Sequence, residues 1–107
     1  MDDELADLIP LFLGEARERL SRLYELLPQV ASHPPALLGA RRELHTLEGS
    51  SRMLGFGSMA NLCREGQTLL ADERDLGVAR VGELLVELGD LLATVAAECA
   101  PAAEPNE

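Results

Sequence analysis

The stretch that decides the fold is residues 37–54, LLGARRELHTLEGSSRML. Apolar or small side chains recur in it every three or four positions, the spacing of one buried helical face; these are Leu37, Ala40, Leu44, Leu47, Ser51 and Leu54. Pro35 can open this helix, because the first helical position needs no amide proton, and Gly55-Phe56-Gly57 ends it. The sequence therefore predicts an amphipathic helix over residues 35–54.

The rest of the chain predicts three more helices of the same kind. The residues on the predicted buried face of each helix, here called its stripe, are Leu13, Ala16, Leu20, Leu23, Leu27 and Val30; Met59, Leu62, Cys63, Gly66, Leu69 and Leu70; and Val78, Val81, Leu85, Leu88, Leu92, Val95 and Cys99. Ser58 can cap the helix over residues 58–73, and Pro10 separates a short helix over residues 2–9 from the first long one. We expect an all-α fold, an antiparallel up-and-down four-helix bundle with a short extra N-terminal helix.

Composition supports this fold and excludes several functions. The 107 residues allow one domain, expected over residues 1–100, with residues 101–107 as a tail or the start of a linker. The 22 Leu and 14 Ala favour helix, and the net charge of −10 argues against nucleic acid as a partner. The absence of Lys excludes a P-loop lysine. No leader or apolar span is visible, so we expect a cytoplasmic protein without membrane insertion, with Cys63 and Cys99 both in the core.

His45 is the residue most suited to chemistry. It follows the core residue Leu44 by one position, so it should face water. Its neighbours on the same helical surface are Arg41, Arg42, Glu48, Gly49 and Arg52. A glycine inside a helix costs about 1 kcal/mol relative to Ala, so Gly49 needs a reason, and bare backbone beside the ring would let a partner approach.

A second prediction comes from the turn at Phe56. Residues equally far from this turn lie at one level on antiparallel helices, which places Gln67 beside His45 and Arg64 beside Glu48. The Gln67 oxygen could then accept the Nδ1 proton of His45 and leave Nε2 free as a nucleophile.

Plainer interpretations compete with this one. A single exposed His on a helix is most often an ordinary surface residue. We interpret His33, in a turn before Pro34, as such a residue without a functional role. Residues 55–60 match the pattern G-x-G-x-x-A of dinucleotide sites, but no strand precedes them, so we interpret them as a turn between helices.

The segment His45-Thr46-Leu47-Glu48-Gly49-Ser50, followed by Gly55, resembles the signature of histidine-containing phosphotransfer (Hpt) domains, commonly His-Thr-Leu-Lys-Gly-Ser with a later Gly. The resemblance extends over residues 60–63 and 12–18, and is strongest to the N-terminal phosphotransfer domains of CheA-type chemotaxis kinases. It implies that His45 carries a phosphoryl group on Nε2, that Gly49 admits a receiver domain and that Gln67 orients the imidazole.

The resemblance also implies partners. A histidine-kinase catalytic domain, in cis or in trans, would phosphorylate His45, and a receiver-domain Asp would take the phosphoryl group. ATP and a divalent metal would belong to those partners, so the chain itself would need no cofactor and would not be a complete enzyme. We expect the isolated domain to be monomeric. The surface expected to meet the receiver comprises Arg41, Gly49, Met53 and Phe56, and the phosphoryl group would lie among Arg42, Glu48, Arg52 and Arg64.

Glu48 departs from the family pattern, in which a Lys stands three residues after the His. A carboxylate there should disfavour phosphohistidine unless a cation intervenes, and Arg52 is spaced for an i,i+4 ion pair with it. On this basis Glu48→Lys is expected to raise the phosphohistidine level and Arg52→Ala to lower it. The alternative is a docking module that binds a receiver or kinase without carrying phosphate.

Overall fold

The computed structural model describes residues 3–99, with side chains described from residue 6 onward. Within this range the chain forms four α-helices, and a short 3₁₀ turn, η1 (Leu27–Gln29), follows the first of them. The helices are α1 (Asp3–Leu26), α2 (Pro34–Met53), α3 (Gly57–Leu69) and α4 (Val78–Cys99). Residues 1, 2 and 100–107, which include Asp2 of the expected first helix and the expected tail, lie outside the described residues.

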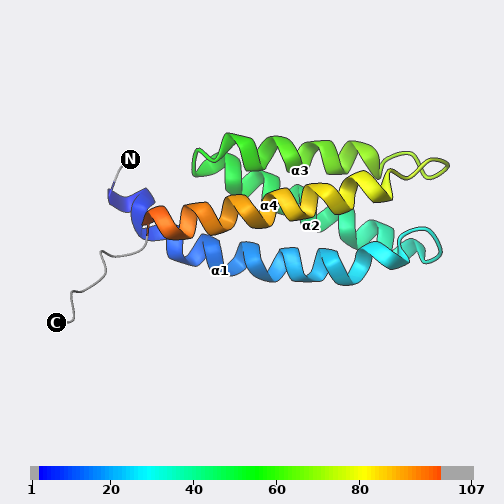
Figure 1. Cartoon of the computed structure of the whole chain (residues 1–107), viewed down its shortest axis with the longest axis horizontal. Helices are drawn as coiled ribbons and strands as arrows, with labels where there is room; N and C mark the ends of the chain where they lie inside the picture. The colour runs from blue at the N-terminus through cyan, green and yellow to red at the C-terminus, as the bar shows by residue number, and fades with distance from the viewer. Residues whose placement is uncertain (1–2, 100–107) are drawn as a thin grey trace.

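The four helices run alternately up and down along the long axis of the molecule (Figure 1). Each packs against two neighbours, in the pairs α1–α2, α2–α3, α3–α4 and α4–α1, so that α2 and α4 lie on a diagonal. The predicted all-α four-helix bundle is confirmed. The core between the helices is built mainly from Leu, Val and Ala, with Ile9, Phe12, Met59 and Cys63, and every position of the predicted α2 stripe is buried. No described helix is long and apolar enough to cross a membrane.

The expected separate N-terminal helix is wrong. One helix, α1, continues from Asp3 to Leu26 with Pro10 inside it. Proline removes one backbone hydrogen bond from a helix interior but does not forbid the helix when packing supports it. Ile9, which precedes Pro10, and Phe12 and Leu13, which follow it, are all buried on one face of α1. Burial of apolar residues before and after Pro10 therefore stabilises the continuous helix.

Three smaller expectations also need correction. Ser58 is not the cap of α3, because the helix begins at Gly57 with Phe56 in the cap position and no side-chain cap bond. The same helix ends at Leu69 rather than near Glu73, and the Gly77 N–H donates to the Leu69 carbonyl at 3.2 Å to close the connection. Cys99 is exposed, because it lies one turn beyond Val95, the last buried residue of α4.

Helices α2 and α3 come very close at Gly66, which is buried between them. A Cβ added to Gly66 would lie 3.0 Å from Leu44 Cδ1 and 3.6 Å from Leu84 Cδ1, both in fully buried leucines. Gly55, at φ +85°, makes the tight turn that reverses the chain between the two helices. A glycine at position 66 therefore sets the spacing of α2 and α3 at the level of His45, which follows Leu44 in the chain.

We predict opposite effects for alanine at two helical glycines. Gly49→Ala should raise the free energy of unfolding by up to about 1 kcal/mol, because a Cβ at Gly49 meets nothing within 4 Å. Gly66→Ala should lower it by about 1–3 kcal/mol, because the new methyl group overpacks Leu44. Urea unfolding of both variants checks this, and equal stabilisation of the two would contradict the packing described here.

Candidate functional site

His45 lies on the exposed face of α2, as predicted, directly after the fully buried Leu44. Its imidazole borders an open depression of about 460 Å³ between α2 and α3, lined by Leu38, Arg41, Arg42, His45, Thr46 and Gln67. Arg41 and Arg42 are exposed, and among residues 6–99 neither forms an ion pair, whereas Arg52 and Arg64 both do. Two guanidinium groups are thus available to an anion placed beside the ring.

The carboxylate of Glu48 is nearly buried and fully engaged. Its side chain is 11% exposed, and its Oε2 lies 3.2 Å from Arg52 Nη2 and 3.3 Å from Arg64 Nε. Its Oε1 accepts a hydrogen bond of 2.8 Å from Gln67 Nε2. The predicted pairing of Glu48 with Arg52, and its proximity to Arg64, are both confirmed, so two cations surround this one anion.

These contacts stabilise the ionised form of Glu48. The hydrogen bond from Gln67 is the largest influence that lowers the pKa of the Glu48 carboxyl below its ordinary value. The hydrogen bond from Arg52 and the charges of Arg64 and Arg52 lower it further, while burial acts in the opposite direction. The carboxylate is therefore charged at neutral pH, and its charge is balanced locally.

Gln67 lies beside His45 at the edge of the same depression, but the structure contains no hydrogen bond between these two described residues. Its Nε2 donates to Glu48 Oε1 and, at 3.2 Å, to the Cys63 carbonyl. Sequence analysis placed Gln67 at the right level of α3 without finding its bond to Glu48. Gln67 follows Glu48 by 19 residues and His45 by 22, so it is within one helical turn of the level of each, and position in the chain alone does not choose between them.

The sequence of this bundle matches one known family. Residues 7–98 match the family model described as the Hpt domain. The chain belongs to the Hpt family. No solved structure matches it. Membership in the family implies a phosphotransfer role in a phosphorelay, which agrees with an exposed histidine in one depression with two guanidinium groups that form no ion pair within residues 6–99.

Next to His45, the Hpt domain presents an open and partly apolar surface. Gly49 is exposed one turn after His45, with nothing within 4 Å of a Cβ built on it. Met53, one turn further, is 67% exposed, and it borders a small depression with Leu8 and Leu11 of α1, which are 41% and 61% exposed. Sequence analysis missed these two leucines, because it assigned Leu8 to a separate helix and gave Leu11 no role, although their spacing of three residues places them on one side of α1.

Phe56 has a different position from the other residues expected to meet a receiver. Its ring is half-buried and packs against Phe12, with centroids 5.3 Å apart, at the edge of the core. It supports the end of the bundle next to this surface and contributes less to the surface itself.

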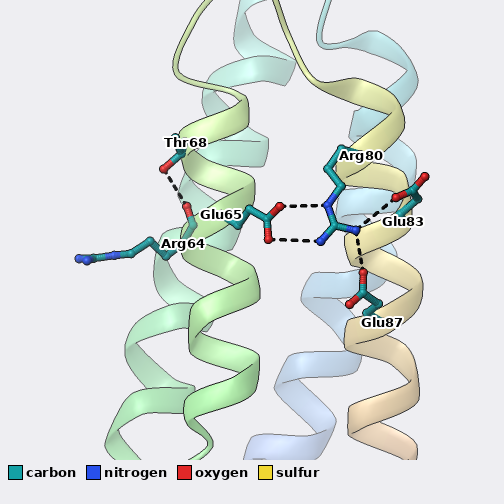
Figure 2. Close-up of polar contacts among 6 residues, drawn as sticks. All are labelled: Arg64, Glu65, Thr68, Arg80, Glu83 and Glu87. Atoms are coloured by element: carbon teal, nitrogen blue, oxygen red, sulfur yellow. Dashed lines mark hydrogen bonds and ion pairs between the residues drawn. The ribbon is translucent and has the colours of Figure 1, made fainter.

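A second cluster of charges lies on the other side of α3 (Figure 2). Arg80 of α4 binds Glu65 of α3 at 2.9 Å, and also contacts Glu83 at 3.2 Å and Glu87 at 2.9 Å. Figure 2 shows the Arg64 side chain directed away from this cluster. The cluster links α3 to α4 and is separate from the charges around His45. The described residues contain no group of three or more His, Cys, Asp or Glu side chains placed to hold a metal ion.

We predict that Glu48→Gln destabilises the domain by about 1–2 kcal/mol at pH 7, because it removes a hydrogen-bonded charge from between two guanidinium groups. The folded-state pKa of Glu48 is lowered, so its contribution is fully present above the ordinary carboxyl pKa near 4.5 and is lost as the pH falls through the folded-state pKa. The difference between wild type and variant should therefore shrink in acid.

Urea unfolding at pH 7 and at pH 3 measures both values. Glu25→Gln is the matched control, since Glu25 is exposed and its carboxylate forms no ion pair among residues 6–99. A Glu48→Gln effect that is independent of pH would contradict the charge-based explanation.

Proposed function

We propose that this Hpt domain is a phosphocarrier of a two-component or chemotaxis phosphorelay. His45 accepts a phosphoryl group and passes it to the aspartate of a receiver domain. The observation that carries the proposal is the position of His45, exposed in a depression together with Arg41 and Arg42 and one turn before the open backbone of Gly49.

The chemistry requires a nucleophilic nitrogen and little else from this chain. The lone pair of His45 Nε2 attacks the γ-phosphorus of ATP held by a kinase domain, the N–P bond forms, and ADP leaves with the electron pair of the broken P–O bond. A receiver carboxylate oxygen then attacks phosphorus, and the N–P electron pair returns to Nε2. Positioning and charge stabilisation dominate phosphoryl transfer, and the partners supply the nucleotide and the divalent metal.

The charges around His45 suit a phosphoryl group in spite of the net charge of −10. Arg41 and Arg42 border the depression and have no carboxylate partner among residues 6–99. Guanidinium groups bind phosphoryl oxygens with paired hydrogen bonds. We assign to Arg42 the role that the family's usual lysine has near the phosphoryl group, and we assign Arg41 to the surface that meets a receiver.

Glu48 does not oppose this function. Arg52, Arg64 and Gln67 hold its carboxylate between α2 and α3, so its charge is already balanced. This arrangement removes the reason for expecting Glu48→Lys to lengthen the life of phosphohistidine. It also removes the main argument for a docking module that carries no phosphate, because that alternative depended on an unbalanced charge at Glu48.

A receiver domain would dock over Gly49 and the neighbouring apolar surface. Met53, Leu8 and Leu11 expose apolar area next to the open backbone, and such patches mark interaction sites on small soluble proteins. Arg41, which borders the same depression as His45, would face the carboxylates of a receiver. The proposed docking surface therefore lies on α1 and α2 and includes His45.

The donor is proposed to be a histidine-kinase catalytic domain, in cis or in trans, acting in the cytoplasm. The likeness of residues 12–18 and 45–55 to CheA-type phosphotransfer domains supports a chemotaxis kinase as this donor. The isolated domain is proposed to act as a monomer.

We predict that His45→Gln abolishes labelling by a histidine-kinase domain with radiolabelled ATP, or by a phosphorylated receiver, while helicity is unchanged. A surface substitution normally changes stability by no more than about 0.5 kcal/mol. In the wild type the label should be lost in acid and survive base, as expected for phosphohistidine. His33→Gln, which changes the other exposed histidine, should label like the wild type. Labelling that persists in His45→Gln would move the acceptor elsewhere.

We also predict that Gly49→Leu slows transfer to a receiver at least about tenfold without unfolding the domain, since a leucine side chain would cover the approach to the ring. Ala93→Leu is the control, because Ala93 is an exposed helical position on α4, diagonal to α2. The measurements are the rate of phosphoryl transfer to a receiver and the thermal unfolding of both variants. Equal rates for the two would show that Gly49 has no part in docking.

A further inference from the structure

An open groove runs between α3 and α4, which lie side by side (Figure 1). It consists of two adjoining depressions of about 500 Å³ and about 280 Å³, which share Ser58 and Leu91 as lining residues. We call this surface the α3–α4 groove. The lining residues that matter for binding are Leu62 and Glu65 of α3 and Glu87, Asp90, Leu91 and Glu98 of α4.

The floor of the α3–α4 groove is apolar. Leu62 and Leu91 pack against the core but are only half-buried, so part of each side chain is open to the groove. The half-buried ring of Phe56 continues this apolar floor in the second depression. An amphipathic helix binds such a groove by placing apolar side chains, spaced three and four residues apart, against the floor.

The edges of the groove carry negative charge. Asp90 and Glu98 are exposed and form no ion pair among residues 6–99. Glu65 and Glu87 both bind Arg80, which lies between them (Figure 2). No Arg among the described residues lines either depression, and the sequence contains no Lys. The apolar floor is therefore bordered by carboxylates, two of which have no cation beside them.

We propose that the α3–α4 groove binds a cationic amphipathic helix of a partner protein. Apolar side chains of that helix would cover Leu62 and Leu91, and its Lys or Arg side chains would lie beside Asp90 and Glu98. Since α3 has 13 residues, a helix of about four turns fits beside it.

The charge of the groove selects this occupant over others. A second copy of the chain carries the same net charge of −10, and residues 100–107 contain two Glu and no basic residue. Nucleic acids and anionic membranes are repelled in the same way. Complementary charge gives an interface its specificity, so a basic partner segment is the occupant that this surface fits.

The α3–α4 groove lies on the other side of α3 from the proposed phosphorylation site. Gln67 of α3 borders the depression at His45, whereas Leu62 and Glu65 line the groove toward α4. A partner helix in the groove therefore leaves His45, and the proposed receiver surface on α1 and α2, uncovered. Binding at the groove does not depend on phosphoryl transfer.

Two synthetic peptides of about 14 residues test the proposal. The first has Leu at every third or fourth position and Lys beside them, and the second has the same composition with the Leu residues distributed around the helix. ¹H–¹⁵N correlation spectra of the ¹⁵N-labelled chain locate each peptide, and fluorescence anisotropy of the labelled peptide gives its Kd.

The first peptide should shift the backbone amide signals of Leu62, Asp90 and Leu91 and leave those of His45 and Gly49 unchanged. It should also bind at least about tenfold more tightly than the second peptide, because only the first can bury an apolar face against the floor. Both peptides carry the same charge, so this ratio separates recognition of the groove from general attraction to an acidic protein.

The double variant Asp90→Asn with Glu98→Gln should raise the Kd of the first peptide about fivefold or more at low salt, because it removes two carboxylates that would pair with Lys. Glu25→Gln with Asp75→Asn is the matched control. It changes the net charge equally, and both residues are exposed, lie outside the groove and form no ion pair among residues 6–99. This control should bind the peptide like the wild type.

Four results would overturn the proposal: no saturable binding of the first peptide, equal affinity for the two peptides, equal weakening by the two double variants, or shifted signals centred away from α3 and α4. The first, second and fourth of these need only the wild-type chain. The measurements use no kinase, receiver or phosphoryl donor. A chain that binds the peptide in the groove but is never phosphorylated would contradict the proposed function and leave the binding site standing.

Discussion

The close approach of α2 and α3 at Gly66 determines where the polar groups around His45 lie. Leu44 fills the space that a side chain at position 66 would occupy, 3.0 Å from an added Cβ. The residues that follow these two in the chain are His45 and Gln67, which border one depression on the surface. The distance between the helices is therefore set by core packing, and the same distance sets the geometry of the site.

The charged residues that meet between α2 and α3 differ in sign from those of the usual Hpt pattern. The family commonly has a lysine three residues after the histidine, and this chain has Glu48 there, with Arg64 on the facing helix 3.3 Å from its carboxylate. Positive charge is retained near the site, but it comes from α3 and from Arg41, Arg42 and Arg52 on α2. A nearly buried carboxylate is tolerated because both of its oxygens have partners.

The sequence predicts the helices well and the side-chain contacts less well, for physical reasons. The α2 stripe follows from its spacing alone, and counting outward from Phe56 places Arg64 beside Glu48. Such counting gives the level of a residue on its helix but not its rotamer, so it could not decide whether Gln67 faces His45 or Glu48. The predicted helix break at Pro10 was wrong. Proline disfavours a helix interior locally, but the burial of residues before and after Pro10 stabilises one continuous α1. The prediction that Cys99 is buried was wrong, because the apolar spacing of α4 continues in the sequence beyond the end of the core.

The central claim is that Nε2 of His45 carries the phosphoryl group. The most direct measurement is ³¹P–¹⁵N coupling in the ¹⁵N-labelled wild-type chain after phosphorylation by a histidine-kinase domain with ATP. A single ³¹P resonance coupled to Nε2 of His45 is the result that the account predicts. Coupling to Nδ1 of His45, to a nitrogen of His33, or a stable phosphate without coupling to any imidazole nitrogen would contradict it.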